Sequence, residues 1–144
     1  ITSLHTRANV AYFGTFGYEL DLNKLTDEEI AEVKAQIIFM KEYRELIQFG
    51  NFYRLKSPFD GNETVWMTVS EDKRKALVFW YRERNVVNAE FTRVRLQGLD
   101  PDLIYKNEYN GTENYGDELM NLGLLTTDVT AGEPTNEDLP CTDY

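Results

Sequence analysis

A net charge of −10 over 144 residues argues against a nucleic-acid-binding surface, because phosphate binding needs clustered lysine and arginine rather than surplus carboxylates. With 42% hydrophobic and 13% aromatic residues, the chain is long enough to bury one substantial core. No apolar run approaches the roughly 20 residues of a membrane-spanning helix, and no basic start followed by an apolar stretch indicates a signal peptide. We therefore expect a soluble protein that binds neither nucleic acid nor membranes.

The chain opens with the pattern of a short helix. Thr2 and Ser3 are good N-cap residues, and Gly14 is positioned to end the helix. Between them, apolar or small residues recur at helical spacing: Leu4, Ala8, Ala11 and Tyr12. The next stretch, Phe16–Leu22, alternates large apolar residues with glycine and carboxylates, which predicts a short strand.

Residues 25–50 carry the strongest local signals. Thr26 followed by Glu29 is a capping box, and Leu25 with Ile30 forms a hydrophobic staple, so a helix is expected to start here. An apolar stripe continues the helical period: Ile30, Val33, Ile37, Met40 and Ile47. Gly50 is expected to end the helix in the left-handed conformation.

The order helix, strand, long helix is typical of a parallel α/β sheet, and one strand cannot make such a sheet. We therefore expect residues 1–50 to be an incomplete α-β-α segment of a larger α/β domain.

After Gly50 the pattern changes to short strands separated by turns. The predicted strands are Asn51–Leu55, Thr64–Ser70, Ala76–Arg84, Glu90–Leu96, Ile104–Tyr109 and Glu118–Leu125. Several short strands at this spacing predict a mainly β fold, an antiparallel β-sandwich of the Greek-key type, over residues 51–144. From Thr126 onward, turn-forming residues dominate and predict a loop or tail.

Few residues suggest catalysis. Glu19 and Asp21 lie two apart on the predicted strand, so their carboxylates would share one face, as in a glycosidase pair; a structural role is the favoured alternative. His5 is the only histidine and is expected to be a solvated or capping residue. One histidine and one cysteine, Cys141, give no zinc-binding pattern, so no metal and no cofactor are expected. A single cysteine also fits a reducing compartment, which favours the cytoplasm.

Aromatic and basic residues offer two further candidates. A sugar-stacking platform could form from Trp66, Phe79, Trp80, Tyr81, Tyr105, Tyr109 and Tyr115. In a strand, however, Phe79-Trp80-Tyr81 must alternate between faces, so part of this set is expected in the core. The basic set Arg82, Arg84, Arg93 and Arg95 is expected to form a solvent face paired with Glu83 and Glu90.

Several runs also resemble one known family. They are YFGTFGYELDL (Tyr12–Leu22), KEYRELIQFGNFYRLKSPFDGN (Lys41–Asn62), WMTVSEDKRKALV (Trp66–Val78), RLQGLDPDLIY (Arg95–Tyr105) and YGDELMNLGL (Tyr115–Leu124). In order and over nearly the whole chain, these runs are similar to the C-terminal part of bacterial α-galactosidases of glycoside hydrolase family 36.

The resemblance implies a domain assignment and a parent activity. Residues 1–50 would be the last α-β-α segment of a (β/α)8 barrel, and residues 51–144 the C-terminal antiparallel β-domain, here lacking its final strand. The family hydrolyses terminal α-galactosides of the melibiose and raffinose type with retention, through two aspartates on earlier barrel strands. The Lys-x-Asp-x-Asn-Arg type motif around the nucleophile does not occur in this sequence, so no residue here inherits a catalytic role.

The resemblance thus implies a fragment of a retaining α-galactosidase that is non-catalytic and structural by itself. Its α-galactoside substrate would bind through the missing barrel, and the residues that bind substrate are unknown. An exposed apolar face on the long helix that starts at Thr26 predicts that the chain self-associates or folds this helix back onto the β-domain. The alternative is a stand-alone carbohydrate-binding or interaction β-module, which exposed aromatic side chains on one sheet face would favour.

Overall fold

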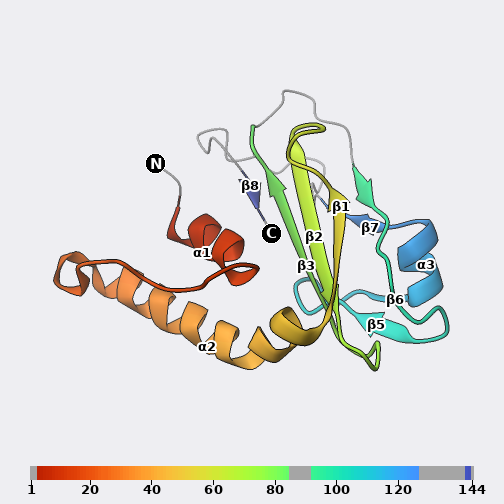
Figure 1. Cartoon of the computed structure of the whole chain (residues 1–144), viewed down its shortest axis with the longest axis horizontal. Coiled ribbons are helices and arrows are strands. Elements are labelled where there is room, and N and C mark those ends of the chain that lie inside the picture. Colours follow the sequence, from red (N-terminus) through yellow and green to blue (C-terminus); the bar gives the residue numbers. More distant parts are fainter. Residues whose placement is uncertain (1–2, 85–91, 127–141, 144) are drawn as a thin grey trace. The chain divides into compact units, whose positions relative to one another are not determined.

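The computed structural model describes residues 3–84, 92–126 and 142–143. The chain divides into two compact units, Ile1–Phe49 and Gly50–Tyr144, whose elements are labelled in Figure 1.

The first unit is built on two helices with well-formed N-termini. Helix α1 (Leu4–Tyr12) begins after Ser3, whose hydroxyl accepts a 3.1 Å hydrogen bond from the Thr6 amide. Helix α2 (Asp27–Phe49) begins with the predicted capping box: the Thr26 amide donates to Glu29 Oε2 over 2.9 Å, and the Glu29 amide donates to Thr26 Oγ1 over 3.2 Å. Both helices are confirmed as predicted from these caps.

The strand predicted at Phe16–Leu22 is wrong for this structure. Residues 15–21 belong to neither helix nor strand, and a short 3-10 helix, η1 (Leu22–Lys24), follows them. A strand requires a neighbouring backbone to pair with, and among the described residues no strand pairs with this segment. The alternation of apolar and polar side chains was therefore not sufficient to predict a strand at residues 16–22.

Aromatic packing holds the first unit together. Tyr12 of α1 lies against Phe39 of α2 at 4.7 Å between ring centroids and against Phe16 at 5.1 Å. The Tyr18 hydroxyl donates a 2.5 Å hydrogen bond to the side-chain oxygen of buried Gln36. Burial, followed by the nearby charges of Tyr18 and Glu32, raises the pKa of Tyr12 to about 12. Residues 13–21 are thus anchored by side chains rather than by a backbone ladder.

The second unit contains a four-stranded antiparallel sheet in the order β1-β2-β3-β8. Its strands are β1 (Asn51–Lys56), β2 (Glu63–Val69), β3 (Ala76–Arg82) and β8 (Thr142–Asp143). The predicted mainly β, antiparallel fold is confirmed. Gly50, expected in the left-handed conformation, is not among the glycines with positive φ, because the chain passes directly from α2 into β1.

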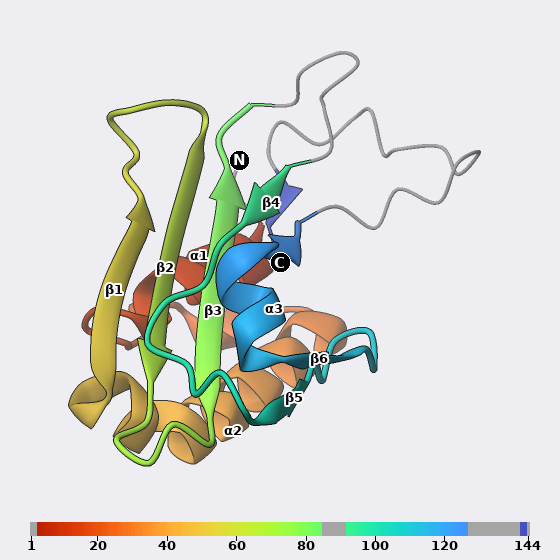
Figure 2. The ribbon, with the colours of Figure 1, turned by 90° about the vertical axis from the view of Figure 1, so that its right-hand side faces the viewer.

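The hydrophobic core lies on one face of this sheet. Val65, Met67, Val69 and Trp80 of β2 and β3 cluster with Val94, Leu96, Leu99 and Leu119. The latter four come from a second layer that includes the pair β4 (Arg93–Val94) and β7 (Leu124–Leu125). Figure 2 shows this layer, with its helix α3, in front of the main sheet.

The strand predicted over Glu118–Leu125 is mostly a helix. Residues Gly116–Asn121 form α3, and only Leu124–Leu125 pair as β7. Asp117 and Glu118 suit the positive N-terminal end of a helix, and Gly123, at φ 87°, then turns the chain toward β7. Before α3, β5 (Ile104–Lys106) pairs with β6 (Glu113–Tyr115), a strand that the sequence did not predict.

Candidate functional site

Glu19 and Asp21 are both exposed, and Asp21 has a local structural role. Asp21 Oδ1 accepts hydrogen bonds from the amide and the side chain of Asn23, each over 3.2 Å, and its other oxygen lies 3.5 Å from Lys24 Nζ. Asp21 therefore caps η1. Glu19 lines a small hollow of about 180 Å³ beside α1. The geometry gives the two carboxylates different surroundings instead of a shared reaction site.

His5 is an exposed residue of α1 whose Nε2 lies 3.1 Å from Asn9 Nδ2, one helical turn away. This contact places His5 in a local side-chain pair on the helix surface.

Among the described residues, no group of three or more His, Cys, Asp or Glu side chains is arranged to hold a metal ion. Cys141 lies outside the described residues. No helix in the described ranges combines the length and apolar character needed to cross a membrane.

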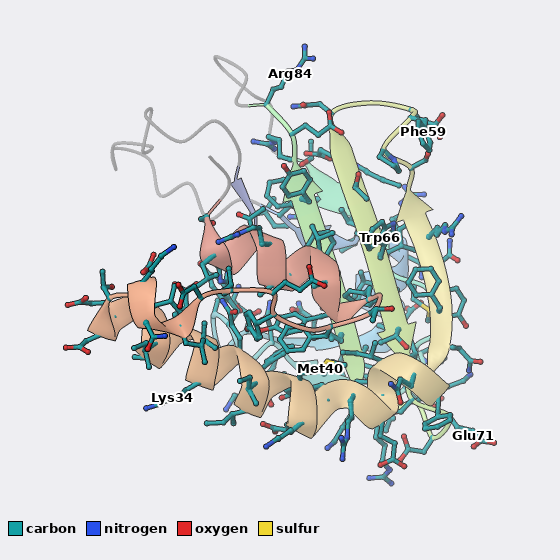
Figure 3. The ribbon with its side chains drawn as sticks, turned by 60° about the vertical axis from the view of Figure 1, so that its left-hand side comes forward. Lys34, Met40, Phe59, Trp66, Glu71 and Arg84 are labelled. Carbon is teal, nitrogen blue, oxygen red and sulfur yellow. The ribbon has the colours of Figure 1, made fainter. Side chains whose placement is uncertain are left out.

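The aromatic residues of the sheet divide between its two faces, as strand alternation predicted. Trp80 is buried in the core cluster, while Trp66 stacks on Phe79 at 5.5 Å and Phe79 on Tyr81 at 6.3 Å on the opposite face. Phe79 is only 4% exposed, so this row is no open platform for a sugar. Figure 3 shows Trp66 on β2 and, at the turn between β1 and β2, Phe59.

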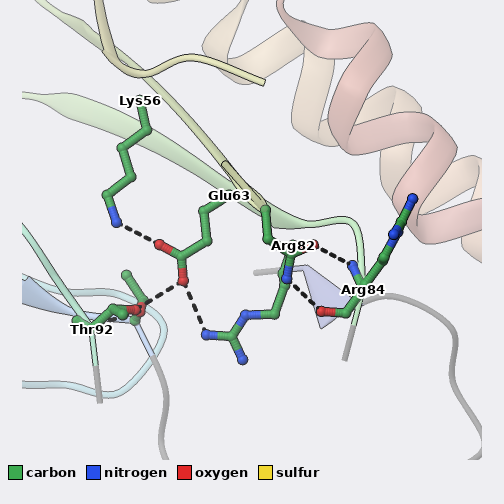
Figure 4. A network of polar contacts seen from close by, with 7 residues as sticks. Lys56, Glu63, Arg82, Arg84 and Thr92 are labelled. Carbon is green, nitrogen blue, oxygen red and sulfur yellow. Dashed lines mark hydrogen bonds and ion pairs between the residues drawn. The ribbon is translucent and has the colours of Figure 1, made fainter. Parts of the chain in front are cut away.

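A cluster of polar side chains surrounds Glu63 at the start of β2 (Figure 4). Glu63 Oε1 accepts hydrogen bonds from Arg82 Nη2 and Thr92 Oγ1, each over 3.0 Å, and Oε2 accepts one from Lys56 Nζ over 2.5 Å. The Thr92 and Thr126 hydroxyls lie 2.7 Å apart. The Glu63 cluster, defined as these five residues, thus ties three strands of the main sheet to the second layer.

The two central charged side chains of this cluster, Glu63 and Arg82, are largely buried, so their interaction is only weakly screened by water. The Glu63 and Arg82 side chains are only 12% and 11% exposed, and Arg82 also lies 4.9 Å from the centroid of the Trp80 ring. Burial alone raises the pKa of the Glu63 carboxyl, but hydrogen bonds from Lys56, Arg82 and Thr92 outweigh it and hold that pKa below its usual value.

The predicted solvent face of arginines is confirmed for Arg84, Arg93 and Arg95, which are exposed, and is wrong for Arg82. Arg82 is buried and pairs with Glu63 rather than with Glu83 or Glu90, of which Glu90 lies outside the described residues. Arg84 is exposed, and its backbone bonds to the Asn62 side chain over 2.6 and 2.9 Å. Glu63 was missed in the sequence because the strand was expected to begin at Thr64. The β2–β3 register, which places Glu63 opposite Arg82, is the signal that could have identified the pair.

Comparisons with known proteins agree with this architecture. The family model for the glycosyl hydrolase family 36 C-terminal domain matches residues 63–140, and the model named Melibiase matches residues 1–50. The α-galactosidase AgaA of Geobacillus stearothermophilus is 49% identical over 124 residues, which cover 86% of this chain and 17% of that protein.

Solved structures of family 36 α-galactosidases are also similar to this chain. The crystal structure of the family 36 α-galactosidase AgaB from Geobacillus stearothermophilus matches with a TM-score of 0.88 and 43% identity, covering 100% of this chain and 19% of that one. An AgaA variant in complex with raffinose matches with a TM-score of 0.88 and 42% identity, again over 100% of this chain and 19% of the other.

The fold and the matches define a C-terminal antiparallel β-domain of a glycoside hydrolase, preceded by a helical segment. The chain belongs to glycosyl hydrolase family 36, and its relatives in that family are α-galactosidases. It spans less than a fifth of the length of the curated relatives it matches.

Proposed function

We propose that this chain is the C-terminal part of a retaining α-galactosidase that hydrolyses terminal α-galactosides of the melibiose and raffinose type. The observation that carries the proposal is the 49% identity to AgaA across 124 residues. The raffinose complex of an AgaA variant supports the substrate class, since its whole-chain match to this protein has a TM-score of 0.88.

In this proposal the chain alone is structural and non-catalytic, and substrate binds to parts of the parent enzyme that lie outside it. Residues 1–50, whose described part forms two α-helices and no strand, contribute the last segment of a (β/α)8 barrel, and residues 51–144 form the β-domain that braces it. Asp21 caps η1, and Glu19 is exposed in different surroundings. Both observations support the absence of a catalytic pair. A cytoplasmic location follows from the expectation of a reducing compartment.

A chimera tests the proposal directly. The region of AgaA that aligns with this chain would be replaced by residues 1–144, and hydrolysis of an aryl α-galactoside would be measured. We expect the chimera to be active, AgaA with the region deleted to be inactive, and this chain alone to be inactive. A folded chimera without activity, or turnover by the chain alone, would contradict the proposal.

We also propose that the isolated chain self-associates through α2. Ile38 is 64% exposed and Phe49 is 80% exposed on this helix, which leaves apolar surface in contact with water. Light scattering on the wild-type chain should show species larger than a monomer, and Ile38→Lys should shift the distribution toward monomer. Lys34→Ala, on an exposed polar position of the same helix, serves as the control. A wild-type chain that is monomeric at all concentrations would disprove this role of α2.

A further inference from the structure

A surface groove with a volume of about 470 Å³ lies between the Pro101–Asp102 turn and α3. Figure 2 shows α3 beside the β5–β6 hairpin in this region. One part of its lining is apolar and consists of Pro101, Tyr115 and Leu122. The other part is polar and consists of three carboxylates and the Asn121 amide. This volume and this mixture of surfaces are within the range of small-molecule sites.

The floor of the groove is fixed by backbone contacts. The Gly116 amide donates a 2.8 Å hydrogen bond to the Leu103 carbonyl, and the Asp117 amide donates one of 3.2 Å to the Pro101 carbonyl. The approach is so close that a Cβ atom on Gly116 would meet the Asp100 carbonyl oxygen at 1.9 Å. The two walls are therefore held in place before any ligand arrives, which lowers the entropic cost of binding.

The apolar wall presents an aromatic ring to solvent. Tyr115 is 54% exposed and Leu122 is 62% exposed, so both side chains are accessible to a ligand in the groove. The phenol ring offers a flat apolar surface together with a polar hydroxyl. Such a surface suits a ligand that has one apolar face and a polar rim.

The polar wall offers hydrogen-bond acceptors. Among the described residues, no lysine, arginine or histidine forms an ion pair with Asp102, Asp117 or Glu118, all of which are exposed. Asn121 Nδ2 donates a 2.5 Å hydrogen bond to Asp117 Oδ1, which links these two exposed side chains. Ionised carboxylates accept several hydrogen bonds each, so they can take up neighbouring hydroxyl groups of one ligand.

We propose that this groove is a non-catalytic binding site for the α-galactosyl end of a saccharide. A galactopyranose ring has an axial hydroxyl at C4, which leaves a continuous apolar face of C–H groups opposite to it. That face can stack on Tyr115 while the ring hydroxyls donate to Asp117 and Glu118. The choice of a galactoside rests on the proposed function, whereas the stacking and hydrogen-bonding geometry rests on the groove itself.

Amide NMR spectra of the 144-residue chain titrated with melibiose test the site. We expect saturable shifts confined to residues 101–122. Tyr115→Ala should weaken binding by about tenfold, because it removes the stacking surface, and Tyr115→Phe should retain it within about twofold. Tyr109→Ala, on an exposed tyrosine outside the groove, is the matched control and should bind like the wild type. A dispersed spectrum verifies that each variant is folded.

Two outcomes would overturn the site. One is an absence of saturable shifts with melibiose, whether or not maltose or an arginine-rich peptide produces shifts. The other is an equal loss of binding in Tyr109→Ala. Since this titration needs no hydrolysis, its failure would leave the chimera experiment unaffected. Conversely, an inactive chimera with an intact melibiose titration would reject the parent activity alone.

Discussion

Glu63 and Arg82 are register partners across β2 and β3, and their side chains are joined by a 3.0 Å hydrogen bond in a largely buried position. Lys56 and Thr92 complete the coordination of the same carboxylate. Removing one member of such a cluster leaves the others without their partner in a poorly solvated place, which is more costly than losing a surface ion pair.

Glu63→Gln should therefore destabilise the second unit by about 2 kcal/mol. The amide keeps the size of the side chain but removes the charge that compensates Lys56 and Arg82. Urea unfolding followed by tryptophan fluorescence measures the change, since Trp66 and Trp80 lie in this sheet. Glu83→Gln, an exposed carboxylate next to the same strand, should change stability by less than about 0.5 kcal/mol. Equal effects of the two substitutions would refute the role of the cluster.

The same cluster predicts an acid-sensitive contribution to stability. The pKa of Glu63 is lowered in the folded state, so its contribution is fully present above the unfolded value of about 4.5. It is lost as the pH falls from there through the lower folded pKa. The difference in unfolding free energy between wild type and Glu63→Gln should accordingly be constant from pH 7 to about 5 and shrink at lower pH. A difference that stays constant through the acid range would show that Glu63 does not titrate with folding.

The helix α2 could be predicted from the sequence, whereas the conformation of residues 16–22 could not. Thr26 and Glu29 specify a helix start through contacts within four residues, so a local pattern was sufficient. The alternation at Phe16–Leu22 describes only which side chains share a face. Whether a strand forms depends on a partner backbone that the local sequence does not contain.

The Glu63 cluster could not be predicted from the sequence for a similar reason. Lys56, Glu63, Arg82 and Thr92 are brought together by the register of β1, β2 and β3 and by the docking of the second layer. Each residue alone has the pattern of a solvated strand position. Tyr115 belonged to the predicted sugar-stacking set, but its groove beside α3 was not predicted, because Tyr115 was expected before a strand rather than before a helix.

Gly116 provides a test of how closely the second layer is packed. Gly116→Ala should destabilise the second unit by at least about 3 kcal/mol, because the added methyl group would lie 1.9 Å from the Asp100 carbonyl oxygen. Gly61→Ala is the control, since a methyl group added there would meet no atom within 4 Å and the φ of Gly61 is not positive. It should change stability by less than about 1 kcal/mol. Comparable urea midpoints for the two variants would mean that the turn at Asp100 can move away from α3.

Glu19 and Asp21 can be tested for catalysis within the AgaA chimera. If neither acts on substrate, Glu19→Gln and Asp21→Asn should each retain kcat within about tenfold, whereas loss of a catalytic carboxylate typically reduces kcat by about 10⁴-fold or more. Asp21→Asn keeps an acceptor oxygen for the Asn23 amide, so η1 should be preserved. Hydrolysis of an aryl α-galactoside gives kcat, and the pH–rate profile gives an independent readout, because a missing acid or base removes one limb of the profile. A loss of the catalytic size with either variant, accompanied by a lost limb, would return that carboxylate to the reaction and reject a purely structural role for this chain.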